Sequence, residues 1–487
     1  MEENEIKSKA FSGVFWKFLE RIGAQLVSLV VSIVLARILS PSDYSVVGVV
    51  LIFFSFANVF ISGGLNTALM QKKEIDVEEY STVLYVSVIL SVVIYLILFF
   101  CAPLIASLYN QEILIIMIRV MGLSLPINAI KSIWCAYISV RLQFRKFFFA
   151  TFGGTIASAV VGICMALNGA GAWALVAQQM TNIVIDTLVL VVSTRIHIVI
   201  KISIKKLKVL FQYGWKVFVS SVISVAYNEI VPLVVGVKYT NDDLSYYTKG
   251  RSFPALITTT TTTTLSAVMF PTLAKFQDDK ERLLKYTRLF IQLSSFVVFP
   301  LMLGFLATAE NFISVVLTDK WLPAAPYIKI FCIAYMFDMI HMGNCETIKA
   351  MGKSGVFLVM EIIKKSSYFI VLAIFLFCTH TPETLALSFI VCTVIAIIVN
   401  AIPNRKLLQY RFRYQIADIL PNLITSLIMC GAVILIGMLK MSPFLCLATQ
   451  VAVGGCVYLA LNFIIGNSSL KYIIGLMQKF LHRKKQI

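Results

Sequence analysis

Long apolar runs recur along almost the whole chain and constrain its fold more than any other feature. Most have about 20 or more residues, the length of a helix that crosses a bilayer, and end at Gly, Pro or charged residues. Because 59% of the 487 residues are apolar and 14% are charged, the chain is expected to be an all-α polytopic membrane protein. We predict about 14 transmembrane helices, at residues 13–38, 43–69, 82–108, 113–139, 147–167, 171–194, 212–238, 246–272, 286–308, 323–348, 355–378, 382–403, 417–439 and 443–465.

Basic residues are distributed unevenly over the predicted loops. One set of loops holds most of them, and the opposite set holds almost only Arg37, Lys238, Lys320 and Lys440. The positive-inside rule assigns the basic loops to the cytoplasm. Since the number of spans is even, we expect both termini of this multi-pass membrane protein in the cytoplasm. The asymmetry explains most of the net charge of +18, so the excess of basic residues does not indicate nucleic-acid binding.

The two ends of the chain carry different sequence patterns. The polar start MEENEIKSK leads into an apolar run that is too long for a signal peptide, so we expect it to enter the first span. The final segment, NSSLKYIIGLMQKFLHRKKQI, places apolar residues at helical spacing and lysines elsewhere. This pattern predicts an amphipathic helix at the cytoplasmic interface. A frayed polar tail is the alternative.

An internal repeat relates the two halves of the chain. SGVFWKFLERIGAQLVSLVVSIVLARILSPSDYSVVG matches YGWKVFVSSVISVAYNEIVPLVVGVKYTNDDLSYYTKG, from Gly13 and Gly214. Two six-helix lobes with the same orientation form a parallel repeat, an arrangement common in alternating-access transporters. We therefore predict three parts. Residues 1–208 form the N-terminal lobe and a basic interdomain loop, residues 209–410 form the C-terminal lobe, and residues 411–487 form two additional helices and the tail.

Polar residues form stripes along single faces of several predicted spans, at spacings of three and four residues. Hydrogen bonding between helices is the alternative explanation for each stripe. Because some stripes also contain Lys or Arg, we favour a hydrated central cavity. The expected lining residues are Gln25, Asn58, Asn66, Ser224, Asn228 and Thr260.

Charged residues inside the spans suggest an anionic cargo. A cationic cavity suits a phosphate, which arginine can bind with two parallel hydrogen bonds; for Lys17, snorkelling to the headgroups is the alternative. The acids could pair with these cations or bind a coupling ion such as H+ or Na+, and the sequence does not separate these roles. The predicted cations are Lys17, Arg21, Arg119, Lys131, Lys249 and Arg251, and the acids are Asp186, Glu229, Asp338 and Glu361.

Seven consecutive threonines, Thr258–Thr264, lie in the eighth predicted span. A threonine hydroxyl in a helix can donate to a carbonyl one turn earlier, so it need not remain unsatisfied. Seven residues cover every face of a helix, and at most about half of them can line a cavity. We expect a bent helix with a polar wall, in which the number of threonines is incidental.

Motifs for chemistry are missing from the sequence. It contains no GxxxxGK[ST] loop of an ATPase, no Asp-x-Asp pair and no long extracytoplasmic loop. Ten scattered cysteines and four separated histidines match no metal motif, and the cysteines are expected to pack as small apolar residues. We expect no enzymatic activity and no bound cofactor.

Two stretches resemble a known family. RLQFRKFFFATFGGTIASAVVGICMALNGAGAWALVAQQM (141–180) and LARILSPSDYSVVGVVLIFFSFANVFISGGLNTALMQKK (35–73) are similar to signatures of Wzx-type polysaccharide flippases. These flippases form the polysaccharide-transport branch of the multidrug/oligosaccharidyl-lipid/polysaccharide exporter superfamily, and the resemblance covers about residues 10–405. It implies a plasma-membrane transporter that flips polyprenyl-diphosphate-linked oligosaccharides for O-antigen, capsule or cell-wall polymers by alternating access.

The resemblance also implies a site and partners. Arginines on helices 1 and 8 contact the diphosphate in related lipid flippases, and Arg21 and Arg251 lie on the matching helices here. Membrane lipids and the polymerase and export proteins of the same pathway are the expected partners of a monomer. A drug/cation antiporter of the same superfamily and a membrane glycosyltransferase or polymerase are the alternatives.

Overall fold

The structure is a computed structural model that describes residues 2–62, 64–71, 75–141, 143–194, 196–378, 380–439 and 441–484. The described residues form helices and no strand, so the predicted all-α class is confirmed. The chain divides into two compact units, Met1–Ser245 and Tyr246–Ile487, called here the N-terminal unit and the C-terminal unit. The repeat boundaries near residues 208 and 410 remain predictions.

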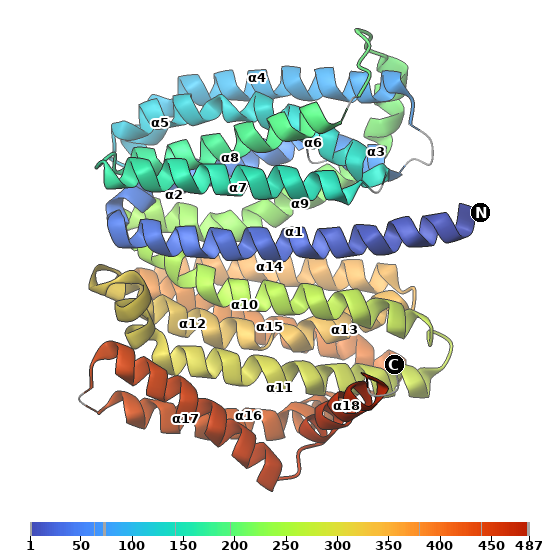
Figure 1. Ribbon diagram of the computed structural model, residues 1–487, viewed down its shortest axis with the longest axis vertical. Coiled ribbons are helices and arrows are strands. Elements are labelled where there is room, and N and C mark those ends of the chain that lie inside the picture. The colour runs from blue at the N-terminus through green and yellow to red at the C-terminus, as the bar shows by residue number, and fades with distance from the viewer. Residues whose placement is uncertain are drawn as a thin grey trace. The chain divides into compact units, whose positions relative to one another are not determined.

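The N-terminal unit is a bundle of long helices (Figure 1). Its helices are α1 (Glu2–Ile38), α2 (Pro41–Ser62), α3 (Leu65–Gln71), α4 (Val77–Leu108), α5 (Ile113–Gly122), α6 (Ser124–Val140), α7 (Phe144–Leu167), α8 (Ala172–Ser193) and α9 (Ile204–Lys238). One of its core clusters joins α3, α4, α6, α7, α8 and α9 through buried side chains that include Leu69, Val83 and Ile133.

The C-terminal unit contains most of α10 and the helices that follow it. These are α10 (Asn241–Ala274), α11 (Lys280–Phe312), the π-helix Ile313–Leu317, the 3-10 helix Asp319–Ala324, α12 (Ala325–Met336), α13 (Asp338–Ala350), α14 (Ser354–Cys378), α15 (Pro382–Leu408), α16 (Phe412–Gly437), α17 (Pro443–Ile464) and α18 (Ser468–Lys484). Helix α18 confirms that the tail is helical, and its position at a membrane interface remains a prediction.

Many of the helices have the properties of membrane spans. Among the described residues, 11 segments are long and apolar enough to cross a bilayer, and Gly23–Ile38 of α1 is a shorter apolar stretch. Two further long helices, α10 with 34 residues and α14 with 25, are not among the 11. The chain is therefore a multi-pass membrane protein, and the number of about 14 spans remains a prediction.

The predicted span 113–139 is interrupted near its proline, Pro126. The run 113–139 consists of α5, which ends at Gly122, and α6, which begins at Ser124. Pro126 lies in the first turn of α6, where its missing N–H costs no helical hydrogen bond. Two other predicted runs are also divided, 43–69 at Gly64 and 323–348 at Phe337.

The turns aligned by the internal repeat share one hydrogen-bonding pattern. The backbone N–H of Ser40 donates to Asp43 Oδ2 at 2.9 Å, and the Asp43 N–H donates to Ser40 Oγ at 3.2 Å. In the second turn, the Thr240 N–H donates to Asp243 Oδ2 at 3.0 Å, and the Asp243 N–H donates to Thr240 Oγ1 at 3.3 Å. In each turn a hydroxyl and a carboxylate satisfy N–H groups at a helix start.

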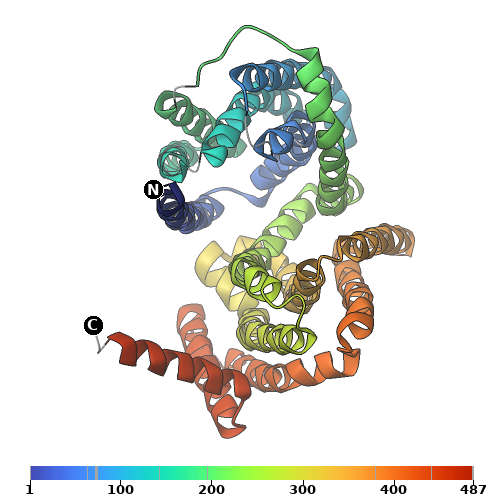
Figure 2. The ribbon, with the colours of Figure 1, turned by 90° about the vertical axis from the view of Figure 1, so that its right-hand side faces the viewer.

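The two additional helices are bonded firmly to the C-terminal unit. Figure 2 shows α16 and α17 beside α11. Asp418 on α16 accepts hydrogen bonds from Arg288 Nη2 at 2.6 Å, Gln292 Nε2 at 2.8 Å and Tyr410 Oη at 2.7 Å. Because Asp418 is buried, these bonds hold α16 to α11.

The threonine run of α10 satisfies most of its hydroxyls within the helix. Six of the seven, all except Thr260, donate to carbonyls three or four residues earlier. Thr258 is buried, whereas Thr259, Thr260, Thr263 and Thr264 are exposed. The predicted back-bonding is therefore confirmed.

Candidate functional site

A polar cavity lies inside the N-terminal unit, between α1, α7 and α8. Its volume is about 410 Å³. Its polar lining residues lie near the middle of helices that are otherwise rich in apolar residues. They are Glu20, Gln25 and Ser28 of α1, Thr155 and Ser158 of α7, and Gln178, Gln179 and Asn182 of α8. Gln25 is therefore the one predicted lining residue that borders this cavity.

Glycines on α7 bring α8 close to this cavity. A Cβ atom on Gly154 would lie 3.1 Å from the Asn182 carbonyl oxygen, and one on Gly162 would lie 3.0 Å from Gln178 Cβ. Figure 1 shows α7 and α8 side by side along their length. The close contact positions the amides of Gln178 and Asn182 opposite the hydroxyls of α7.

The hydroxyls of α7 are already oriented by hydrogen bonds. Thr155 Oγ1 donates to the Thr151 carbonyl at 2.7 Å, and Ser158 Oγ donates to the Thr155 carbonyl at 2.9 Å. Asn182 Nδ2 donates to Ser158 Oγ at 3.4 Å. Each hydroxyl keeps an acceptor oxygen, and each side-chain amide offers both donors and acceptors. Such a lining can exchange hydrogen bonds with the hydroxyl groups of a sugar.

Most of the cavity lining is uncharged. Glu20, which is 8% exposed, is the one charged side chain among the described lining residues. One turn beyond Asn182, the buried Asp186 forms an ion pair with Lys131 Nζ of α6 at 2.5 Å. The structure thus brings together a predicted substrate cation and a predicted coupling acid. In this arrangement each neutralises the other.

Two predicted cations of α10 are enclosed by aromatic side chains in the C-terminal unit. Arg251 Nε donates to Tyr335 Oη at 2.8 Å, and its Cζ lies 5.5 Å from the centre of the Phe389 ring. Lys249 is 7% exposed, and its Nζ lies 5.7 Å from the Trp321 ring. Aromatic faces attract cations, so both positions accommodate positive charge.

Gly250, between these two cations, permits the approach of α10 to the start of α12. A Cβ atom here would lie 2.5 Å from Tyr327 Cβ and 2.9 Å from the Ala324 carbonyl oxygen. A side chain would therefore displace one of the two segments.

The remaining predicted residues lie elsewhere. On α1, the side chains of Lys17 and Arg21 are outside the described residues. Arg119 lies over the Phe99 ring at 4.2 Å. Asn58 and Asn228 donate to the Phe54 and Ser224 carbonyls, both at 2.9 Å, as helix-internal bonds. Asn66 is buried, Thr260 and Ser224 are exposed, and Glu229 is half-buried.

A charged cluster in the C-terminal unit contains two predicted acids. Lys364 on α14 forms an ion pair with Glu361 and lies 3.4 Å from His341 Nε2 on α13. Asp338, one turn before His341, is within electrostatic reach of Lys364. Asn400 Nδ2 on α15 contacts His341 Nδ1. We call Asp338, His341, Glu361, Lys364 and Asn400 the His341 cluster.

His341 and Lys364 were missed by sequence reasoning. The pairs 338/341 and 361/364 are each spaced by three residues, so each shares one helical face. The criterion of one-face polar spacing, applied to α13 and α14, would have indicated them. The same criterion applied to α8 would have indicated Gln178 and Asn182, which are four residues apart.

Solved structures share the fold over most of the chain. The structure titled "Lipid II flippase MurJ, inward closed conformation" has a TM-score of 0.76 and 16% identity, covering 93% of this chain and 98% of that one. An inward-facing multidrug resistance MATE family transporter has a TM-score of 0.61 and 13% identity, covering 79% of this chain and 94% of that one. These similarities place the chain in one fold class with membrane transporters.

Sequence comparison is more specific than the fold. The polysaccharide biosynthesis protein family matches residues 34–326, and the chain belongs to this family. The succinoglycan biosynthesis transport protein ExoT of Rhizobium meliloti is 24% identical over 66% of this chain and 65% of its own length. The teichuronic acid biosynthesis protein TuaB of Bacillus subtilis is 19% identical over 94% of this chain and 95% of its own length. The expected relationship to polysaccharide exporters is confirmed.

Proposed function

We propose that this protein flips a polyprenyl-diphosphate-linked oligosaccharide across the plasma membrane, for export of a surface polysaccharide. The polar cavity within apolar helices of a polysaccharide biosynthesis family member, lined mainly by amides and hydroxyls, carries this proposal. A sugar that crosses a bilayer loses hydrogen bonds to water, and each unsatisfied hydroxyl costs roughly 1–3 kcal/mol. The amides and hydroxyls of the cavity replace these bonds.

The diphosphate needs a different environment from the sugar. We propose that Arg251 binds it, together with Arg21 on α1, because arginine forms two parallel hydrogen bonds with phosphate oxygens. The transport cycle is proposed to be alternating access, with both termini in the cytoplasm and no enzymatic step. The protein is proposed to act as a monomer beside the polymerase and export proteins of its pathway.

We propose the His341 cluster as the coupling site. The carboxylates of Asp338 and Glu361 would bind and release H+ or Na+. The Lys364 ammonium would compete with this ion for the carboxylates. Charged groups at membrane depth are costly, so a cluster of this kind is a functional site by default. Flipping rates measured with either a pH gradient or a sodium gradient would identify the ion. If the flipping rate without either gradient equalled the rates measured with each gradient, this assignment would be contradicted.

Reconstituted vesicles test the proposed function. A fluorescent polyprenyl-diphosphate oligosaccharide is placed in one leaflet, and its arrival in the other is followed with a quencher that cannot cross the bilayer. The protein should accelerate this movement, and Arg251→Ala and Arg21→Ala should each slow it about tenfold, as expected from the loss of one charge-assisted bond.

Arg282→Ala is the matched control. Arg282 forms an exposed ion pair with Asp279 at 3.1 Å. Its replacement by alanine changes the net charge by the same amount as Arg251→Ala or Arg21→Ala. This variant should flip at the wild-type rate. Movement no faster than in protein-free vesicles would contradict the flippase function. Transport of cationic dyes in its place would indicate a drug antiporter.

A further inference from the structure

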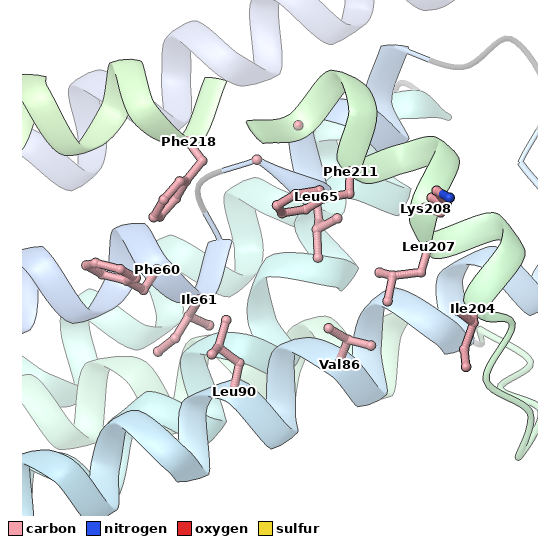
Figure 3. Close-up of a pocket in the computed structure, with 12 residues that line it drawn as sticks. Phe60, Ile61, Leu65, Val86, Leu90, Ile204, Leu207, Lys208, Phe211 and Phe218 are labelled. Carbon is pink, nitrogen blue, oxygen red and sulfur yellow. The ribbon is translucent and has the colours of Figure 1, made fainter. Parts of the chain in front are cut away.

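A second cavity of the N-terminal unit is almost entirely apolar. It lies between α2, α3, α4 and the first half of α9 and has a volume of about 480 Å³. Figure 3 shows Phe60 and Phe218 at one end and Leu65 and Phe211 near its middle. The rings of Phe60 and Phe218 pack edge to face, with their centroids 5.1 Å apart. Lys208 is the one charged residue among its described lining residues, and it is exposed.

The first part of α9 extends beyond a membrane span. The helix has 35 residues and is ~52 Å long, whereas the hydrocarbon core is ~30 Å thick. Part of the helix therefore lies beyond the hydrocarbon core, and its first turns, which contain Lys205, Lys206 and Lys208, are the basic part. In this segment Ile204 is 77% and Phe211 58% exposed. Exposed apolar side chains beside exposed lysines are typical of a helix at the membrane interface.

Two glycines hold this segment against α3. A Cβ atom on Gly64 would lie 2.3 Å from the Gly214 carbonyl oxygen, and one on Gly214 would lie 2.9 Å from the Gly64 carbonyl carbon. The two backbones are therefore in direct contact, and both glycines also line the cavity. The position of α9 that forms the cavity depends on this contact.

The lysines near the cavity differ in their ionic partners. Lys201 pairs with Glu78 at 3.1 Å, and Lys206 pairs with Glu78 at 2.6 Å and with Asp76 at 3.1 Å. Hydrogen bonds to Glu78 and Asp76 raise the pKa of the Lys206 ammonium above its usual value. Lys205 and Lys208 belong to none of these pairs. Lys208 is thus a cation at the mouth of an apolar cavity.

We propose that this cavity binds one acyl chain of an anionic phospholipid from the surrounding membrane, with the lipid phosphate at Lys208. An apolar cavity of this size is within the range of about 300–1,000 Å³ of small-ligand sites. A lysine is a single point charge, which matches a phosphodiester of charge −1, whereas a diphosphate calls for several cations. The site is independent of the proposed cargo.

Delipidated protein in detergent tests the proposal by native mass spectrometry. The probes are phosphatidylglycerol and phosphatidylcholine with identical acyl chains. Wild-type protein should bind phosphatidylglycerol more tightly, and Lys208→Gln should weaken that binding about fivefold, the factor expected for one basic residue at an anionic lipid surface. Lys205→Gln, the same charge change on the same helix outside the cavity lining, should leave it unchanged.

Photo-cross-linking keeps the test independent of variant folding. Phosphatidylglycerol with a photoreactive acyl chain should label peptides that contain Leu65 or Phe211 in the wild-type protein. Equal weakening by Lys205→Gln and Lys208→Gln, equal binding of both phospholipids, or labelling elsewhere would overturn the proposal. Binding of polyprenyl phosphate in preference to phosphatidylglycerol would also overturn it and assign the cavity to the carrier lipid.

Discussion

The polar cavity of the N-terminal unit and the His341 cluster of the C-terminal unit are both polar regions among apolar helices, but they differ in construction. The cavity encloses about 410 Å³ and presents amides and hydroxyls with little charge. In the cluster, Lys364 forms an ion pair with Glu361 and contacts His341. Neutral donors and acceptors around a volume suit a hydroxylated cargo, whereas compensated charges suit an ion.

The largest effect is expected from Lys364→Met in the cluster. Loss of the ammonium leaves Glu361 without its ion partner, and breaking a buried pair in this way costs about 3–5 kcal/mol. Because the Glu361 side chain is 28% exposed, we expect the free energy of unfolding to fall by ~2–3 kcal/mol. Thermal or denaturant unfolding in detergent measures this change.

Glu361→Gln in the Lys364→Met background provides the control. Removal of the uncompensated charge should restore part of the lost stability. A Lys364→Met protein as stable as the wild type would show that the cluster charges do not compensate one another, and the contrast with the cavity would fail.

Gly154→Val should have the next largest effect, because it acts on the contact that forms the cavity. The new side chain would meet α8 at the Asn182 carbonyl, and overpacking typically costs about 1–3 kcal/mol. We expect loss of stability together with loss of cargo binding. Gly153→Val is the control, since a Cβ atom there meets nothing within 4 Å. Equal behaviour of the two variants would argue against the close α7–α8 contact.

Gln178→Ala should weaken binding of the lipid-linked oligosaccharide without unfolding the protein. One neutral hydrogen bond contributes ~1 kcal/mol, which corresponds to about fivefold in affinity. The matched control is Asn168→Ala, since this exposed amide at the end of α7 donates to the Cys164 carbonyl at 2.8 Å. If Asn168→Ala weakened binding as much as Gln178→Ala, the cavity would not be the cargo site.

The smallest effect is expected from Thr260→Val. Its side chain is exposed, and its neighbours in the run bond within the helix. Transport rate and unfolding free energy should both stay close to the wild-type values in the assays above. A large loss of transport would mean that the threonine run itself contacts the cargo.

Local features of the fold were predictable from the sequence. Apolar run lengths located most helices, Pro126 placed the break between α5 and α6, and the internal repeat aligned the turns at Ser40 and Thr240, which share one hydrogen-bonding pattern. The threonine hydroxyls also bond back as expected. Each of these depends on neighbours in sequence, which is why periodicity and turn chemistry sufficed.

Contacts between helices were not predictable. Lys131 and Asp186 are 55 residues apart, and the stripe pattern gave no reason to pair them. Gln25 was assigned to a cavity from its own helix. The spacing of Gln178 and Asn182 marks one polar face of α8, but only the close α7–α8 contact places that face at the cavity. The start of α9 was taken as a basic loop, because its lysines obscured the first turns of a long helix.

Native mass spectrometry of the protein extracted gently from its own membrane tests whether the polar cavity binds the cargo sugar. We expect an adduct with the mass of a polyprenyl diphosphate that carries several sugars. This adduct should be strongly reduced in a Gln178→Ala/Asn182→Ala double variant, with phospholipid adducts unchanged. Equal occupancy in both proteins, or phospholipid adducts alone, would contradict the assignment of the polar cavity to the cargo sugar.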